Sequence, residues 1–89
     1  MAFMQLEQRA TRVHAGARHF LYLPDRSGAD AVASTLQRLG WETDVYDDAD
    51  VCLVVAAPLR VLTGQLAREA RAHLEALAAA HGGSYDGMD

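Results

Sequence analysis

The chain ends in GGSYDGMD (residues 82–89), and this short stretch decides which fold the preceding segments can form. A helix that stops at the double glycine needs no particular continuation. Yet residues 84–87, SYDG, place an aromatic ring, a carboxylate and a flexible glycine together at the end of the chain. Whether this tail is a loose end or a structured element depends on what the rest of the chain provides.

Three segments before the tail have the patterns of β-strands. Residues 17–24 (ARHFLYLP) alternate between two faces, are enriched in aromatics and end at a proline, and residues 41–47 (WETDVYD) alternate in the same way. Residues 51–58 (VCLVVAAP) are apolar at both odd and even positions, which is typical of a central strand covered by its neighbours. The intervening DDAD indicates a tight turn between the second and third strands.

Two further segments have helical spacing. In residues 25–40 (DRSGADAVASTLQRLG), Val32, Leu36 and Leu39 recur on one face, an Asp or Ser is available as N-cap, and Gly40 is a stop signal. In residues 63–83 the apolar stripe comprises Leu66, Ala70, Leu74, Leu77 and Ala78, and the double glycine forms the C-cap.

The order strand, helix, strand, strand, helix lacks one partner. Two strand-helix-strand halves would complete a split βαβ arrangement, and only the tail is left to supply the missing strand. We therefore predict an α+β fold of βαββαβ order, with a four-stranded antiparallel sheet, two helices on one face and the tail as an edge strand. Residues 1–89 are expected to form one domain, with residues 1–14 either a short helix or a loosely ordered N-terminal extension.

Composition narrows the class of function. The net charge of −4 and the pI of about 5.4 disfavour a surface that neutralises many phosphates, so no direct nucleic-acid binding is expected. Cys52 is the only cysteine and lies in an apolar run, which favours a small buried side chain over a disulfide or a reactive thiol. Neither a secretion signal nor an apolar run long enough to cross a membrane is visible, which predicts a cytoplasmic location.

The face of the sheet without helices is the first candidate site. Alternation places Leu21 and Leu23 toward the helices and turns Phe20 and Tyr22 outward, and it places Tyr46 on the wet face of its strand. We expect these three rings to form an exposed group beside Cys52 or Val54. Protein contact ranks above the stacking of RNA bases, because carboxylates flank the rings. A third interpretation, ranked at least as high as either, is that the N-terminal segment covers them.

An acidic run, Asp44, Asp47, Asp48 and Asp50, surrounds the turn between the second and third strands. It lacks the glycine and the final glutamate of an EF-hand loop, so a solvated turn ranks above a calcium site. If the run binds a partner, a basic protein segment is the better match, since clustered carboxylates attract arginine-rich segments.

No catalytic constellation is found. The four histidines, at positions 14, 19, 73 and 81, show no metal-binding spacing, and the serines lack the context of a nucleophile. We therefore expect no enzyme, no cofactor and no metal.

Three parts of the chain carry a family resemblance: residues 19–46, the apolar third strand and the closing residues 73–89. The most specific features are His19-Phe20, the helix end from Leu36 to Trp41, and the terminal Gly-Ser-Tyr-Asp-Gly of residues 83–87. Over roughly residues 12 to 88, the chain resembles the bacterial regulator of ribonuclease activity B family, the ribonuclease E inhibitors. Members of that family typically close with Gly-x-Tyr-Asp-Gly-Trp, and here Met88 stands in the place of the tryptophan.

The resemblance implies a ferredoxin-like sandwich and a non-catalytic protein that binds ribonuclease E and restrains its RNA processing. On this interpretation Tyr85 and Asp86 belong to the protein-binding surface. The alternative is that Tyr85 packs on the sheet and Asp86 with Gly87 forms a turn. Two other functions stay open: an RNA-binding module using the open face, and a ligand-sensing homodimer formed through edge strands or open faces.

Overall fold

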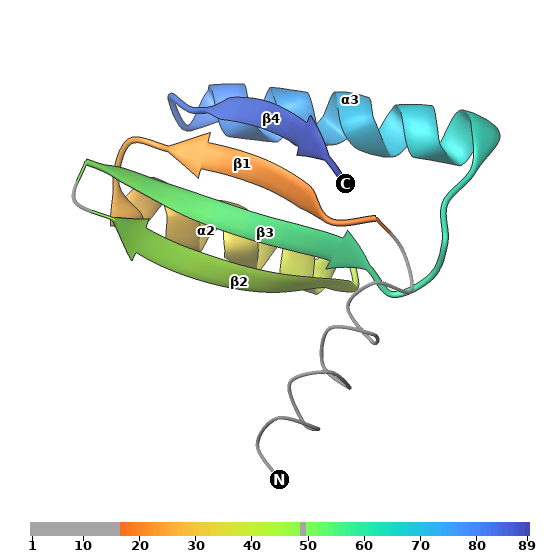
Figure 1. Ribbon diagram of the computed structural model, residues 1–89, viewed down its shortest axis with the longest axis horizontal. Helices are drawn as coiled ribbons and strands as arrows, with labels where there is room; N and C mark the ends of the chain where they lie inside the picture. Colours follow the sequence, from red (N-terminus) through yellow and green to blue (C-terminus); the bar gives the residue numbers. More distant parts are fainter. Residues whose placement is uncertain (1–16, 49) are drawn as a thin grey trace, which may run out of the picture.

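The computed structural model describes residues 17–48 and 50–89, so the predicted N-terminal extension lies outside the described residues. Within them the chain forms two helices and four strands in the order βαββαβ (Figure 1). Their bounds are β1 His19–Leu23, α2 Arg26–Arg38, β2 Trp41–Asp48, β3 Val51–Pro58, α3 Gly64–Ala80 and β4 Ser84–Met88.

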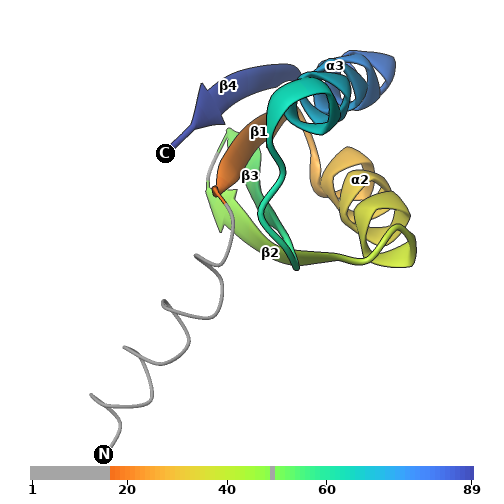
Figure 2. The ribbon, with the colours of Figure 1, turned by 90° about the vertical axis from the view of Figure 1, so that its right-hand side faces the viewer.

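The strands form one antiparallel sheet in the order β2-β3-β1-β4. The tail is therefore an edge strand, as predicted, and it pairs with β1 rather than with a strand nearer in sequence. Both helices lie on the same side of the sheet (Figure 2). The predicted α+β, ferredoxin-like arrangement of a split βαββαβ sandwich is confirmed.

Local signals set the ends of α2. The carboxylate of Asp25 accepts a hydrogen bond of 2.7 Å from the backbone N–H of Gly28, which satisfies one of the free donors at the helix start. Gly40 follows the helix with a φ of 92°, a left-handed conformation that glycine adopts without strain. The predicted aspartate cap and glycine stop are thus both present.

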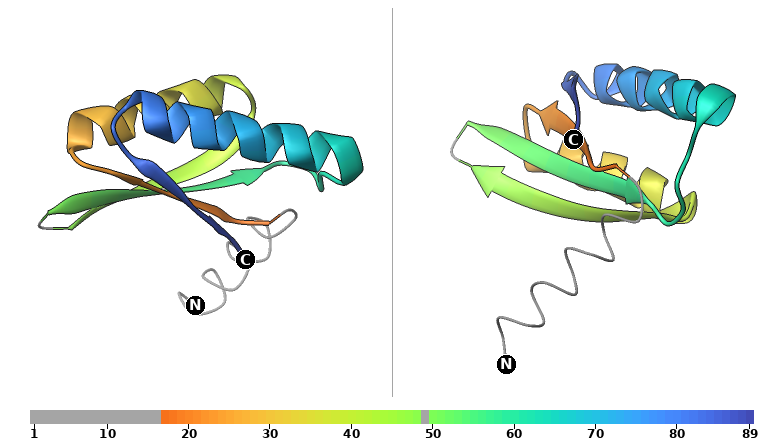
Figure 3. Two further views of the ribbon diagram at one scale, coloured as in Figure 1. Left: turned by 90° about the horizontal axis from the view of Figure 1, so that it is seen from above. Right: turned by 45° about the vertical axis from the view of Figure 1, so that its right-hand side comes forward.

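The core lies between the sheet and the two helices. Its largest fully buried side chains are Leu21, Leu23, Val32, Leu36, Val54 and Leu74. As predicted, Leu21 and Leu23 face the helices, and strand alternation then turns Phe20 and Tyr22 to the other side. Seen from above, both helices lie on one side of the sheet, and no helix of the described part covers the other side (Figure 3).

Helix α3 is buried over only part of its length. Leu74 and Ala78 are fully buried, but the side chain of Leu66 is 55% exposed, so the predicted stripe does not reach the core at its first turn. The reason is geometric: the N-terminal half of α3 extends past the ends of β1 and β4 (Figure 1). We call residues 64–71 the overhang of α3.

Candidate functional site

The open face, defined as the side of the sheet away from the helices, carries two cross-strand rows of side chains. In the first row Tyr46 of β2 and Tyr22 of β1 flank Leu53 of β3. In the second row Val55 lies between Asp44 of β2 and Phe20 of β1. Directly opposed residues in a sheet are close enough for their side chains to touch, so the three rings and two aliphatic side chains form one surface.

The rings differ in how accessible they are. Tyr46 is 55% exposed on the edge strand, whereas Phe20 and Tyr22 are half-buried. The guanidinium of Arg18 lies 5.7 Å from the ring centre of Phe20 and forms an ion pair with Asp89. Tyr46 is therefore the most accessible of the three rings.

The predicted neighbours of these rings need a correction. Cys52 and Val54 are buried on the helix side, and Leu53 and Val55 are the β3 residues beside the rings. The sequence did not predict this orientation, because β3 has apolar residues at both its odd-numbered and its even-numbered positions. Neither group of positions could be identified as the one that faces away from the helices. Burial raises the pKa of the Cys52 thiol, with Asp47 adding to the effect, so the thiolate form is disfavoured.

The acidic run is divided between the two sides of the sheet. Asp44 is exposed on the open face and Asp50 is exposed in the turn. Asp47 pairs with Cys52 and lies on the helix side, where it accepts a hydrogen bond of 3.6 Å from the Cys52 thiol and lies 3.7 Å from Arg26. The side chain of Asp48 lies outside the described part. The acidic run therefore does not form one continuous surface, and within the described residues no three metal-binding side chains meet.

A second cluster, which the sequence did not reveal, lies on the helix side around His19. The imidazole is only 6% exposed, and its Nδ1 lies 2.8 Å from the hydroxyl of Tyr85. The ring of Trp41 meets it edge-on at 5.5 Å between centres. Burial lowers the pKa of His19 and raises that of Tyr85, so both groups are held neutral near neutral pH.

The position of Tyr85 agrees with the interpretation in which it packs on the sheet, and its role in protein binding stays a prediction. Tyr85 is paired with Leu21 and packs against the core on the helix side, so it does not share a surface with Tyr46. Asp86 is exposed on the edge strand β4. The only sequence signal for the His19–Tyr85 contact was alternation in β1, which puts His19 on the same face as Leu21.

The terminal glycines also have structural roles. A Cβ atom on Gly83 would lie 2.0 Å from the carbonyl oxygen of Tyr22, because the chain passes directly against β1 at this point. Gly87 has a φ of 100° where the pairing of β1 and β4 shifts register. The pattern Gly-x-Tyr-x-Gly of residues 83–87 therefore attaches the last strand to the sheet.

Comparison with known proteins supports one family. The family model described as regulator of ribonuclease activity B matches residues 6–89, which is nearly the whole chain. No curated protein and no solved structure shows significant similarity to it. In the part that the structure describes, neither helix has the length and apolar character needed to cross a membrane.

Proposed function

We propose that the chain, which belongs to the regulator of ribonuclease activity B family, acts by docking on a ribonuclease E-type nuclease and restraining its RNA processing. Membership of this family indicates a role in regulating ribonuclease activity. The docking mechanism, the identity of the nuclease, the absence of catalysis and the cytoplasmic location belong to the proposal.

The open face is the surface that we assign to docking. Its two rows combine an exposed tyrosine, an apolar centre and the carboxylate of Asp44, with Glu42 next along the same strand. Interfaces tend to place aromatic anchors at their centre and charged groups around them. The observation that carries the proposal is therefore the group Tyr46–Leu53–Tyr22, with Asp44 at its side.

The charge of this surface favours a basic protein segment over RNA. Glu42 and Asp44 repel phosphates and attract arginine side chains. The candidate residues Asp44 and Asp50 remain suitable for such a partner, whereas Asp47 is already engaged with Arg26 and Cys52. We assign Asp86 to the margin of the surface and leave Tyr85 out.

Two aspartates of β2 provide a matched test. Asp44→Asn and Asp47→Asn remove the same charge from the same strand, one on the open face and one on the helix side. Binding to the purified ribonuclease E-type nuclease of the same genome is measured by biolayer interferometry, beside cleavage of a model RNA. We expect Tyr46→Ser to weaken binding by roughly tenfold or more and Asp44→Asn by roughly threefold, with matching losses of inhibition.

Asp47→Asn serves as the control and should bind like the wild type. Circular dichroism melting of each variant shows that the fold is kept. Equal losses from both aspartate variants, or none from Tyr46→Ser, would place docking elsewhere. A wild-type protein that neither binds the nuclease nor slows cleavage would refute the docking mechanism itself.

The predicted homodimer stays a prediction. The edge strands β2 and β4 are the surfaces through which two copies would pair. Sedimentation equilibrium across a range of concentrations tests it, since a dimer gives a mass that rises with concentration.

A further inference from the structure

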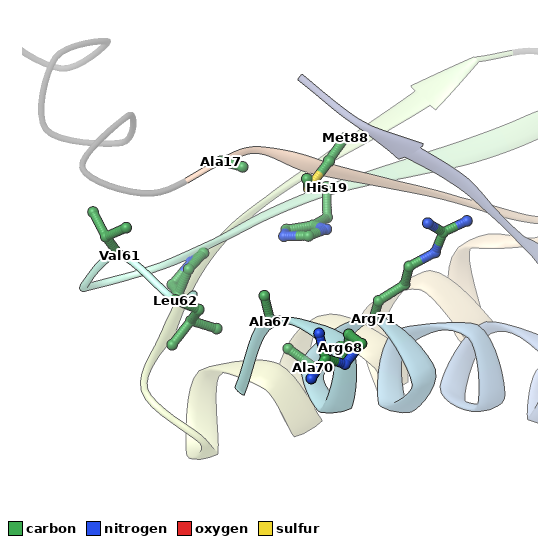
Figure 4. Close-up of a pocket in the computed structure, with 10 residues that line it drawn as sticks. Ala17, His19, Val61, Leu62, Ala67, Arg68, Ala70, Arg71 and Met88 are labelled. Atoms are coloured by element: carbon green, nitrogen blue, oxygen red, sulfur yellow. The ribbon is translucent and has the colours of Figure 1, made fainter. Parts of the chain in front are cut away.

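A pocket of about 300 Å³ lies on the helix side, where the overhang of α3 faces the paired ends of β1 and β4 (Figure 4). Its walls are largely apolar. Val61 and Leu62 of the loop before α3, Ala67 and Ala70 of the helix, and Met88 of β4 contribute to them. None of these residues belongs to the open face described above.

Small side chains on the helix keep this space open. Further along α3, Leu74 is fully buried against the core, but the corresponding positions of the overhang are the alanines 67 and 70. An alanine cannot fill the gap that a leucine fills, and packed protein interiors rarely leave a void of this size. The overhang therefore leaves a partly open pocket instead of extending the core.

Polar groups are few in the pocket: His19 of β1 on one wall, and Arg68 and Arg71 of α3 on the other. His19 lines it, and its ring projects from β1 toward the helix (Figure 4). Nδ1 is occupied by the hydroxyl of Tyr85, whereas Nε2 has no hydrogen-bond partner among the described residues. Every fully buried side-chain nitrogen in the described part of the chain has a hydrogen-bond partner. Because Nε2 has none, this atom is not fully buried and is in contact with solvent-accessible space.

The tautomer of His19 is linked to the direction of this hydrogen bond, because the Tyr85 hydroxyl can both donate and accept. A neutral imidazole that accepts the Tyr85 hydroxyl proton at Nδ1 carries its own proton on Nε2. In that tautomer Nε2 is a hydrogen-bond donor, whereas if Nδ1 donates to the hydroxyl oxygen instead, Nε2 is an acceptor.

Two arginines supply positive charge at the same site. Arg71 reaches over the ring of Tyr85 at 5.7 Å and pairs with Glu75 at 3.3 Å. Arg68 donates to the neutral amide of Gln65 at 2.9 Å and makes no ion pair within residues 17–48 and 50–89. Among the described residues that line the pocket are two arginines and no carboxylate, and because Arg71 is paired with Glu75, Arg68 is the cation that a ligand would meet.

The mouth of the pocket is unusually apolar. Val61 is 64% exposed and Met88 is 61% exposed, both large side chains in contact with solvent. An apolar ligand that enters the pocket would cover part of this surface and gain the corresponding hydrophobic free energy.

We propose that this pocket binds a small molecule with an apolar body and a carboxylate head, the body between Ala67, Ala70 and Leu62 and the head toward Arg68. A space of about 300 Å³ accommodates roughly ten non-hydrogen atoms, taking about 30 Å³ for each water-sized group. Octanoate has this size and this chemistry. The site is independent of the proposed docking surface, because it lies on the other side of the sheet.

The test is a titration of the full, isotope-labelled chain with octanoate, followed by backbone amide NMR spectra. We expect saturable shifts centred on Val61, Leu62, Ala67, Ala70 and Met88. Octanol, which has the same chain length but no charge, should bind roughly fivefold more weakly, because it cannot pair with the guanidinium.

Two arginine variants separate site-specific charge from net charge. Arg68→Gln should weaken octanoate binding by roughly fivefold, whereas Arg38→Gln, which removes the same charge from the exposed end of α2, should leave it within about twofold. Ala70→Leu, which fills the pocket, should remove the saturable shifts.

The opposite results are equally clear. Shifts centred on Phe20, Tyr22 and Leu53 would show that octanoate binds the open face as a detergent does. Equal binding of octanol, or equal effects of the two arginine variants, would overturn the carboxylate assignment. No saturable shift with either probe would overturn the site.

Discussion

At the scale of single residues, the family signature at the chain end is mainly structural. Gly83, Tyr85 and Gly87 are the glycines and the aromatic of that signature, and each contributes to holding β4 against β1. The chain departs from the family at Met88, which lines the pocket mouth where the family has a tryptophan. The residues of this signature and the residues that we propose for docking are thus largely different sets.

Gly83 gives the sharpest test of this interpretation. A Cβ atom there would lie 2.0 Å from the Tyr22 oxygen and 2.7 Å from a Leu23 methyl group, and the backbone oxygen cannot move without disturbing the sheet. We expect Gly83→Ala to lower the free energy of unfolding by about 1–3 kcal/mol, the usual cost of overpacking. Urea unfolding followed by circular dichroism measures it.

The neighbouring exposed residue is the control for Gly83. Ser84→Ala also changes β4 but adds no atom to a crowded position, so we expect a change below about 0.5 kcal/mol. Similar effects from both variants would mean that the close approach of the chain to β1 is not what the glycine provides.

The buried His19 makes stability depend on pH. Burial lowers its pKa from the usual 6.5, so the unfolded chain binds this proton more readily than the folded chain does. The stabilising contribution is therefore complete above pH 6.5 and is lost as the pH falls through the lowered pKa of the folded state.

Unfolding free energies from about pH 8 to about pH 5 should show this decline, and the His19→Gln variant should show a smaller one, since carboxylates contribute the remainder. NMR titration of the imidazole protons reports the pKa directly. A value at or above 6.5 in the folded protein would contradict the assignment of His19 as a buried neutral group.

At the scale of elements, α3 has two functional halves although its sequence pattern is continuous. Leu74 anchors the buried half, and Leu66 lies on the exposed overhang. We expect Leu74→Ala to lower the free energy of unfolding by about 2–5 kcal/mol, through lost burial and the cavity left behind. Leu66→Ala should change it by less than about 1 kcal/mol, because little apolar area is buried there.

Both variants delete the same atoms from the same helix, so helix propensity cancels in the comparison. Chemical unfolding of the two proteins under identical conditions suffices. A large loss from Leu66→Ala would show that the overhang is covered in solution, by a second copy or by another part of the chain.

The elements themselves were predictable, but some of their contacts were not. Periodicity and glycine or proline stops predicted the strands and helices between residues 17 and 89, and counting strands predicted β4. Alternation also placed Phe20, Tyr22 and Tyr46 on the open face. Alternation could not orient β3, because both faces of this strand are apolar. Cys52 and Leu53 are both apolar, so the sequence does not indicate which of them faces the helices.

At the scale of the whole molecule, the limits of sequence reasoning come from register. The contact between His19 and Tyr85 joins residues 66 positions apart, and it exists only because β1 and β4 pair in one particular register. In the same way, the acidic run looked continuous along the chain, but a strand sends Asp44 and Asp47 to opposite sides. The pocket depends on how far α3 extends past the sheet, which no local pattern encodes.

The distribution of charge over the molecule leads to the last prediction. The chain carries a net charge of −4. Two of its carboxylates, Glu42 and Asp44, lie on the open face beside the aromatic rings. If a basic segment of the nuclease docks there, long-range attraction speeds the encounter, and salt screens it.

Raising the salt concentration from about 0.05 M to about 0.5 M should then slow association by about tenfold while changing dissociation by less than about twofold. Stopped-flow or interferometric rates at several salt concentrations measure both. Asp44→Asn should reduce the salt dependence more than Asp47→Asn does, although the two variants have the same net charge. Equal reductions would assign the attraction to total charge rather than to the open face.

The same pair of variants distinguishes a protein partner from RNA by the sign of the effect. Removing the carboxylate of Asp44 takes an attraction away from a basic segment but a repulsion away from a phosphate backbone. Docking on protein therefore predicts weaker binding of Asp44→Asn to the nuclease and negligible binding of either protein to a short single-stranded RNA. Stronger binding of the variant to RNA than of the wild type, with unchanged binding to the nuclease, would instead identify the open face as an RNA-binding surface.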